Sequence, residues 1–516
     1  MRPGTDVTYW TLIADAAQRL SNRPLLADEH GRSLTARQLH DAARATAAAL
    51  AERGVHAGTV VSWQLPTTLE TMVVMAALAR LGAVQNPMIP ILRENEVGFI
   101  TGQLATEFFV VPEIWRGFDH GGLARALAQQ RGFEVITVDL VTPPIAGELR
   151  LPRGHPSALT APPAPAGDTR WIYYSSGTTA APKGIRHTDT SLIAGSAAVV
   201  GMVGNNSTDV NPIAFPIAHI GGAAMLATAL LTGLRLVLFE AFDPVKTPLA
   251  IAAQNPTFLG TATPFFVAFL EAQRAHGHQP LFPSLRGCLA GGASITAELG
   301  RQVRDTLGVA GIANAWGLTE FPAATSPPLD AAPQVLDYTV GAPISGVTVR
   351  VVDNQEIELP TGREGELRLK GPQCFLGYVD AALDADAFDR DGWLRTGDVG
   401  LIDADGNVRV TGRIKDAIIR NAENISALEI EDALATHPGV ADVAVIGVPD
   451  PRTGERVCAV VVAASAEGVS LESLVQHCRS QGLSRYKHPE RLIVVDALPR
   501  NQFGKVIKRD LRAAFG

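Results

Sequence analysis

Residues 173–188 read YYSSGTTAAPKGIRHT, and this stretch gives the first indication of both the fold and the chemistry. Four hydroxyl side chains, two glycines and one lysine fall within the ten positions 175–184. Hydroxyls and backbone N–H groups donate to phosphate oxygens, glycine lets the backbone approach closely, and lysine adds a positive charge. The stretch therefore predicts a phosphate-binding loop. A solvated Ser/Thr/Gly linker is the alternative that its composition leaves open.

The apolar and aromatic run before this loop, Trp171–Tyr174, predicts a buried strand. Ligand-binding loops in α/β proteins commonly follow the ends of strands, so this position agrees with a binding role. The loop is not of the Walker A type, which requires Gly-Lys-Ser/Thr, because here Lys183 is followed by Gly184 and Ile185. A P-loop kinase is therefore excluded.

The composition favours a folded, soluble protein of at least two domains. The chain has 516 residues, of which 46% are hydrophobic and 19% charged, and this length exceeds a single core. The net charge of −8 comes without basic blocks, which argues against nucleic acid and acidic membranes as partners. The cysteines have neither metal-ligand spacing nor the pattern of a disulfide framework, so we expect a reducing, cytoplasmic location. They are Cys288, Cys374, Cys458 and Cys478.

Neither a signal peptide nor a membrane span is expected. The first 20 residues contain no apolar core followed by a cleavage site. The most membrane-like stretch, Ile220–Leu234, is shorter than a span requires and is followed by Arg235. It therefore predicts a buried helix rich in glycine and alanine.

Helices and strands are expected to alternate along the first part of the chain. Helical periodicity covers residues 33–54 and 68–82, and apolar strand-like runs cover 60–63, 108–111 and 135–138. This alternation predicts doubly wound, parallel α/β sheets. A proline-rich connector, residues 142–168, then leads into the quoted loop.

The pattern changes to β structure after about residue 340 and to a compact β/α pattern from Ile414 onward. The first of these parts has turn signals at Asp353-Asn354 and near Gly362, and a hairpin with Asp405-Gly406 at its tip. We therefore predict a large N-terminal domain of doubly wound sheets with a β-rich subdomain, and a small, mobile C-terminal α+β domain. The predicted boundaries are 1–412 for the first domain, 413–416 for a hinge and 417–516 for the second.

Five further motifs carry residues suited to chemistry. They are FPIAHIGG with His219, LAGGA at 289–293, NAWGLTE with Glu320, RTGD and GRIKD with Asp398 and Arg413, and LPRNQFGK with Lys505. Taken singly, most have an ordinary explanation, such as a turn cap, a core histidine or a surface lysine. Glu320 is different, because a carboxylate within an apolar, aromatic segment is expected to have a partner such as a metal.

The order of these motifs, covering nearly the whole chain, resembles the adenylate-forming superfamily of acyl-CoA synthetases, peptide adenylation domains and beetle luciferases. Residues 418–462 are most similar to acyl-CoA synthetases, including cyclohexanecarboxylate and medium-chain ligases. The resemblance implies an acid–thiol ligase that uses ATP and Mg²⁺ to form an acyl-adenylate. The acyl group then passes to the thiol of coenzyme A.

The resemblance also implies where the nucleotide binds. The β- and γ-phosphates would be held by Ser175, Ser176, Gly177, Thr178, Thr179 and Lys183. The adenine and part of the acyl pocket would be bounded by Gly291, Gly292, Ala293 and Trp316. Thr319 would contact the α-phosphate, and Glu320 would hold Mg²⁺. Asp398 and Arg413 would bind the ribose hydroxyls.

The remaining implied roles concern the acyl group and the exchange between two half-reactions. Lys505 would bridge the attacking carboxylate and the α-phosphate, and His219 would line or gate the acyl site. The C-terminal domain would rotate at Lys415 between the steps. The second orientation would bring three residues close to the thiol tunnel, namely Ala422, Glu423 and Asn424.

Three positions depart from the common family pattern. Ala180 replaces a frequent glycine in the phosphate loop, Trp316 replaces a frequent tyrosine, and NAEN at 421–424 replaces a common GGEN. None of these changes removes a charged catalytic group. A catalytically dead homologue, expected to lack Lys505, Glu320 or Asp398, is therefore disfavoured.

The acid is expected to carry an uncharged acyl group, because FPIAHIGG offers no carboxylate to pair an amino acid's ammonium. The small residues at 221–224 would leave room for a medium-length, branched or ring-bearing chain. An enzyme that loads a carrier protein shares all these motifs and is the alternative. The motifs leave a homodimer open.

Overall fold

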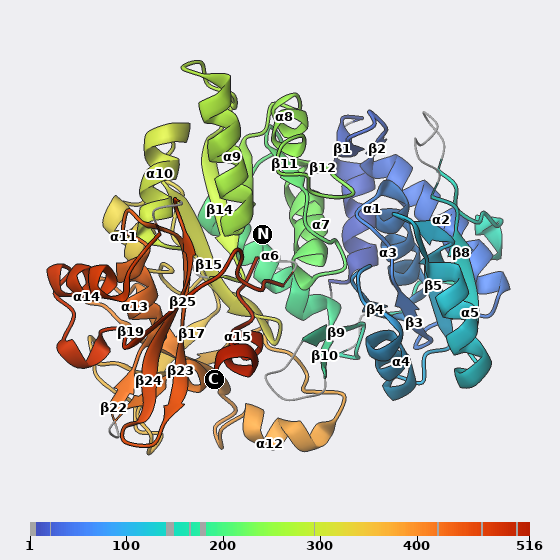
Figure 1. Cartoon of the computed structure of the whole chain (residues 1–516). Helices are drawn as coiled ribbons and strands as arrows, with labels where there is room; N and C mark the ends of the chain where they lie inside the picture. The colour runs from blue at the N-terminus through green and yellow to red at the C-terminus, as the bar shows by residue number, and fades with distance from the viewer. Residues whose placement is uncertain are drawn as a thin grey trace.

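The computed structural model describes residues 7–20, 22–140, 149–164, 167–175, 182–293, 295–420, 423–465, 468–501 and 504–516. Figure 1 shows the blue and cyan elements of the first 140 residues at one side of the molecule and the red C-terminal elements at the other. Green α6 (Asp189–Val203) and α7 (Ile220–Thr232) lie between them, whereas the yellow-green α10 (Ala297–Leu307) and α11 (Pro333–Tyr338) lie on the same side as the red elements.

Three sheets are built from residues 24–325. The first has the order β11 (Val210–Ile213), β12 (Arg235–Leu238), β1 (Pro24–Asp28) and β2 (Ser33–Thr35). The second has the order β10 (Lys183–His187), β9 (Trp171–Ser175), β4 (Val84–Pro87), β3 (Val60–Trp63), β5 (Phe108–Pro112) and β8 (Glu134–Val138). The third has the order β13 (Phe258–Thr261), β14 (Gly287–Gly291), β15 (Ile312–Leu318) and β16 (Phe321–Thr325). A two-stranded ribbon pairs β6 (Ile114–Trp115) with β7 (Phe118–Asp119).

Strand β5 of the second sheet is buried on both faces, which explains why it reads as a continuous apolar run. In β5 the side chains of Phe108 and Val110 belong to the largest core, whereas those of Phe109 and Val111 belong to a separate core on the opposite face. Successive side chains of a strand point to opposite faces, so a strand between two apolar cores has apolar side chains on both sides.

Helices cover both faces of these sheets. They are α1 (Tyr9–Arg19), α2 (Ala36–Glu52), α3 (Leu69–Leu81), α4 (Glu94–Gln103), α5 (His120–Arg131), α6 (Asp189–Val203), α7 (Ile220–Thr232), α8 (Thr247–Ala252), α9 (Thr263–His276), α10 (Ala297–Leu307) and α11 (Pro333–Tyr338). Short 3-10 turns lie at Pro156–Ala158, Ala381–Leu383, Ile414–Asp416 and Arg485–Lys487. α1, α3, α6 and α7 contribute to the largest core, and α4 and α5 cover the other face of the second sheet.

A fourth, antiparallel sheet follows, as the change of pattern near residue 340 predicts. It has the order β17 (Thr348–Val352), β18 (Gly365–Lys370), β19 (Leu394–Ile402) and β20 (Val408–Arg413), with α12 (Asp384–Ala387) in the connection before β19. The predicted hairpin joins β19 to β20, and Gly406 in its turn has a φ of +84°. Glycine adopts that left-handed conformation without steric cost, so the turn signal was read correctly.

The last 100 residues form a fifth sheet with its own helices. Its strands are β21 (Ile418–Arg420), β22 (Glu423–Ile425), β23 (Val440–Asp450), β24 (Gly454–Ala463) and β25 (Arg491–Val494), and its helices are α13 (Ala427–Leu434), α14 (Leu471–Ser480) and α15 (Lys508–Phe515). Alternate side chains of β24 enter two separate cores, one with α13 and α14 and the other with α15. The observed α/β sheets, β-rich part and α+β end agree with the predicted fold class. The boundary at residues 412–416 stays a prediction.

Candidate active site

β15 organises the candidate site, because motif residues lie along it and at its end. Gly291 at the end of β14 pairs with Ala315 in parallel register, so the LAGGA motif lies next to Trp316. Trp316 is buried, and its indole Nε1 donates to Asp398 Oδ2 at 2.8 Å. Gly292 has a φ of +79°, which makes the predicted tight turn after β14. Ala293 follows in the same loop.

Thr319 and Glu320 form the two-residue connection between β15 and β16, where Leu318 pairs with Phe321. The Thr319 carbonyl accepts a hydrogen bond from His187 Nε2 at 2.8 Å. Burial lowers the pKa of His187 to about 4, so this imidazole is neutral at pH 7.

Glu320 has a protein partner, as a carboxylate in this setting requires. The Tyr378 hydroxyl donates to Glu320 Oε1 at 2.9 Å, and the Phe375 backbone N–H donates to the Glu320 carbonyl at 2.9 Å. No set of three or more His, Cys, Asp or Glu side chains capable of holding a metal is found among the described residues. Among the described residues, a metal at Glu320 would therefore have fewer than three protein ligands of these types.

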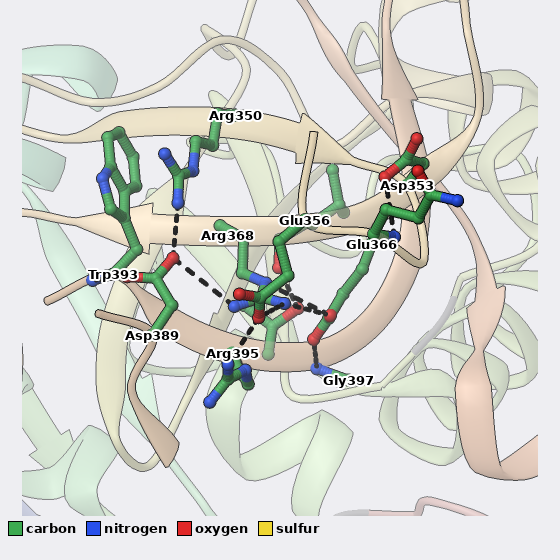
Figure 2. Close-up of polar contacts among 12 residues, drawn as sticks. Arg350, Asp353, Glu356, Glu366, Arg368, Asp389, Trp393, Arg395 and Gly397 are labelled. Carbon is green, nitrogen blue, oxygen red and sulfur yellow. Dashed lines mark hydrogen bonds and ion pairs between the residues drawn. The ribbon is translucent and has the colours of Figure 1, made fainter. Parts of the chain in front are cut away.

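Asp398 lies in an irregular part of β19. Its neighbour Gly397 is contacted by Glu366, within a cluster of charged side chains (Figure 2). The pairing register of β18 with β19 shifts between Glu366 and Arg368, because the segment Thr396–Gly397–Asp398 of β19 bulges away from β18. Glu366 Oε1 accepts from the Gly397 N–H at 3.2 Å, and Glu366 Oε2 pairs with Arg368 at 2.9 Å.

The same network fixes Arg368, which is buried between carboxylates. Arg368 also contacts Glu356 at 3.2 Å and Asp389 at 3.5 Å. Arg350 pairs with Asp389, and Arg395 pairs with Glu356. Figure 2 shows these side chains converging around Arg368 between the strands. A buried guanidinium with several acceptors is stable in this place, so the bulge that carries Asp398 has a rigid support.

Arg413 lies directly opposite Asp398 on β20, and its Nε is 2.7 Å from Asp398 Oδ1. The Asp398 side chain is buried, whereas Arg413 is 42% exposed. The two predicted ribose-binding residues are therefore adjacent in space. Of these two residues, Asp398 also accepts the hydrogen bond from Trp316 on β15.

Lys505 belongs to the C-terminal part of the chain but lies against this same region. The pKa of Lys505 is lowered to about 8, chiefly by burial and also by the Arg413 cation, while the carboxylates of Asp398 and Asp416 oppose the shift. Gly504, the preceding residue, lies against Pro264 in the N-terminal part: a Cβ on Gly504 would be 2.5 Å from Pro264 Cδ. The structure thus brings Lys505, Asp398 and Arg413 together.

The two ends of the quoted loop are described, but most of the loop is not. Ser175 ends β9 and pairs with Lys183, the first residue of the antiparallel β10. Lys183 therefore begins a strand, whereas the sequence alone assigned it to the loop. Its Nζ lies 5.2 Å from the centre of the Tyr378 ring. Ser176, Gly177, Thr178 and Thr179 lie outside the described residues.

His219 is the N-cap of α7, and its Nδ1 accepts from the Gly221 N–H at 3.2 Å. Burial lowers the pKa of His219 to about 4, so it is neutral at pH 7. The expectation that Gly222 leaves room for an acyl chain is wrong, because a Cβ there would be 1.9 Å from the Ile217 carbonyl oxygen. A Cβ on Gly221 would likewise meet the His219 ring at 3.3 Å. These glycines are required by close packing and are no evidence for a wide pocket.

The remaining predicted residues lie beyond β20. Lys415 is in the 3-10 turn between β20 and β21. Glu423 and Asn424 are in β22, where they pair with Arg420 and Ile419. Ala422 lies outside the described residues.

Three supporting residues had no recognisable signal in the sequence. Tyr378 and His187 meet Glu320 and Thr319 across separations of 58 and 132 residues. Glu366 occurs in an ordinary alternating strand, and only its contact with Gly397 distinguishes it. No local pattern encodes contacts of this kind.

No helix in the described part of the chain is long and apolar enough to cross a membrane. All four cysteines are among the described residues, and none forms a disulfide.

The chain is similar to known proteins over almost its whole length. It is 32% identical to the medium-chain fatty-acid–CoA ligase of Escherichia coli (strain K12), covering 98% of this chain and 89% of that protein. It is 31% identical to the salicyl-AMP ligase / salicyl-S-ArCP synthetase of Mycobacterium tuberculosis, covering 98% and 92%.

The solved structure of ATP-bound MatB from Rhodopseudomonas palustris matches with a TM-score of 0.85 at 28% identity, covering 98% of both chains. The apo form of the same enzyme matches with a TM-score of 0.75. The model of the AMP-binding enzyme family matches residues 13–379, and that of the AMP-binding enzyme C-terminal domain matches residues 429–505. The chain therefore belongs to the AMP-binding enzyme family and is an adenylate-forming ligase, as the order of its motifs indicated.

Proposed function

We propose that this ligase couples ATP to an uncharged carboxylic acid, releasing pyrophosphate, and then transfers the acyl group from the adenylate to coenzyme A, releasing AMP. The observation that carries the proposal is the position of Lys505. The Lys505 ammonium, from the C-terminal part of the chain, is partly buried and interacts electrostatically with Asp398 and Arg413. Asp398 in turn accepts a hydrogen bond from Trp316 of the NAWGLTE motif. A cation at this position suits a reaction between two anions.

The nucleotide would lie along β15. Asp398 and Arg413 would bind the ribose hydroxyls, and Trp316, with Gly291, Gly292 and Ala293, would bound the adenine. Thr319 would contact the α-phosphate at the end of the strand. The β- and γ-phosphates would extend toward Ser175, Lys183 and the loop between them, including Ser176, Gly177, Thr178 and Thr179.

Glu320 fits the binding of Mg²⁺. Mg²⁺ prefers oxygen ligands and is commonly held by one or two carboxylates together with substrate phosphates and water, so the Glu320 carboxylate at the predicted phosphate end suits it. When bound, Mg²⁺ would neutralise phosphate charge. Lys505 would add its own charge between the incoming carboxylate and the α-phosphate. The carboxylate oxygen attacks the α-phosphorus, and the bond to pyrophosphate breaks.

The second step would require Lys505 to leave. The thiol sulfur attacks the acyl carbonyl, AMP leaves, and the thiol proton passes to solvent. We propose that the C-terminal part, residues 417–516, rotates at the 413–416 hinge containing Lys415. Ala422, Glu423 and Asn424 would then lie near the thiol tunnel.

For the acid, a medium-chain, branched or alicyclic acyl group is proposed. FPIAHIGG contains no acidic residue, and the His219 imidazole is neutral, so the motif offers no charge to an amino acid's ammonium. The similar Escherichia coli protein bears the name of a medium-chain fatty-acid–CoA ligase. His219 would line the acyl site. We expect the enzyme to work in the cytoplasm.

The test is ATP–pyrophosphate exchange with a panel of medium-chain, alicyclic, aromatic and amino acids, followed by product analysis with coenzyme A. Exchange with uncharged acids and formation of their coenzyme A thioesters is expected. Exchange with amino acids alone contradicts the proposal. Lys505→Ala should abolish exchange but retain thioester formation from a supplied acyl-adenylate.

Loading of a carrier protein is the second candidate, because a relative 31% identical to this chain is named as a salicyl-S-ArCP synthetase. Coenzyme A and a phosphopantetheinylated carrier protein, offered in competition with the same acid, distinguish the two acceptors. Acylation of the carrier with no thioester on coenzyme A favours this candidate.

A further inference from the structure

Tyr378 lies on a segment that runs alongside β10. Ile185 and Tyr378 form an antiparallel bridge, and the Val379 N–H donates to the Gly184 carbonyl at 2.8 Å. Tyr378 is also held by its own N–H, which donates to Asp384 Oδ1 at 2.7 Å. The strand that begins at Lys183 therefore fixes the backbone of Tyr378.

The buried Tyr378 side chain contacts two groups of the proposed phosphate site. Its hydroxyl donates to Glu320 Oε1 at 2.9 Å. Its ring lies under the Lys183 ammonium, 5.2 Å from Nζ, at a distance where a cation is attracted to the face of an aromatic ring. One side chain thus joins the lysine and the carboxylate, which come from different sheets.

The chemistry of the phenol suits an orienting role. A phenol keeps its proton at neutral pH, so the Tyr378 hydroxyl is a donor to Glu320 Oε1. A donor on Oε1 restricts rotation of the carboxylate. Within the described residues, Oε2 receives no hydrogen bond, so it remains available to a cation. Loss of a partner that orients a metal-binding carboxylate typically lowers metal affinity by about 10–100-fold.

We propose that Tyr378 is a positioning residue: its hydroxyl orients Glu320 toward Mg²⁺, and its ring holds Lys183 for the phosphates. This role rests on the proposed function, because it requires Mg²⁺ and ATP to bind here. Tyr378 itself does not touch the reacting atoms.

The experiment measures equilibrium binding of ATP by calorimetry over a range of Mg²⁺ concentrations. Tyr378→Phe removes the hydroxyl and keeps the ring, so we expect the Mg²⁺ concentration for half-maximal enhancement of binding to rise about 10-fold. ATP binding in EDTA should change less than about twofold, since the ring under Lys183 remains. Tyr378→Leu should also weaken ATP binding in EDTA.

Two controls separate orientation from general damage. Tyr338→Phe removes the hydroxyl of an exposed tyrosine and should leave both quantities unchanged. In a Glu320→Gln background, Tyr378→Phe should add no further change in Mg²⁺ dependence, because its target is already lost. If the wild type binds ATP with Mg²⁺ and Tyr378→Phe shows the same Mg²⁺ dependence of ATP binding, the role of Tyr378 is overturned but the proposed function is not. A wild type that binds no ATP with Mg²⁺ overturns the proposed function and this role together.

Discussion

The charge on Lys505 depends on the groups that surround its ammonium. Its pKa is lowered from 10.5 to about 8, chiefly by burial and also by Arg413 and Lys508, with Asp398 and Asp416 partly compensating. The protonated form therefore predominates below pH 8 and is lost as the pH rises through 8. If Lys505 neutralises charge in adenylate formation, the free enzyme loses this ability within the ordinary assay range.

We expect kcat/KM for ATP in pyrophosphate exchange to fall about tenfold per pH unit above pH 8, because this parameter reports ionisation of the free enzyme. Lys505→Arg, whose guanidinium stays charged at these pH values, should have lower activity but no fall of this kind between pH 8 and 9.5. The measurement is a pH series for both proteins. A fall of equal steepness in Lys505→Arg contradicts the assignment to Lys505.

At the scale of elements, the second sheet was predictable and the contacts between motifs were not. Phe108–Val111 of β5 and Trp171–Tyr174 of β9 are apolar or aromatic at successive positions because both faces of the sheet are covered, and such runs are visible in a sequence. The start of β10 at Lys183 was missed, because Lys183 and Gly184 carry no apolar pattern and their strand is defined by pairing with β9. The close approach of Gly222 to Ile217 was missed for the same reason: the sequence shows a small residue but not what occupies the space beside it.

The candidate residues were recognised from the sequence, whereas the groups that hold them were not. Asp398 stood out in RTGD, but its partner Trp316 is 82 residues away, and the support of its bulge by Glu366 depends on how β18 and β19 pair. Long-range pairing of this kind is decided by the whole fold.

The bulge of β19 offers a test of how an element positions a residue. Glu366→Ala removes the acceptor of the Gly397 N–H and one carboxylate of buried Arg368. We expect a loss of about 1–3 kcal/mol in stability, because Arg368 keeps Glu356 and Asp389, and at least about a tenfold loss in AMP affinity. Thermal unfolding and AMP titration measure the two effects.

Glu366→Gln keeps an oxygen that can accept from Gly397, so its loss of AMP affinity should be smaller than that of Glu366→Ala. Glu358→Ala, at an exposed position of the neighbouring connection, serves as the control and should change neither quantity. Unchanged AMP affinity in Glu366→Ala would mean that the bulge is held without this contact.

At the scale of the whole molecule, the C-terminal part is seated where Lys505 can act. Arg512 pairs with Asp416 at 2.9 Å, and Ser426 Oγ donates to the Thr411 carbonyl, so residues on both sides of the 413–416 turn are connected. The contact between the C-terminal and N-terminal parts includes Gly504 packed against Pro264, where a side chain on residue 504 has no space.

Gly504→Ala therefore tests whether this seating matters for only one of the two steps. The new Cβ would approach Pro264 Cδ to 2.5 Å, and the φ of +72° adds about 1 kcal/mol of backbone strain. Gly482→Ala is the matched control: its φ is +79°, but no atom lies within 4 Å of the added Cβ.

We expect Gly504→Ala to lower pyrophosphate exchange by at least about tenfold, because a barrier increase of about 1.4 kcal/mol has that effect. Thioester formation from a supplied acyl-adenylate should change by less than about twofold, since it uses the other orientation of the C-terminal part. Gly482→Ala should spare both steps, so an equal loss of both steps in Gly504→Ala would show that the glycine serves folding and not the seating of Lys505.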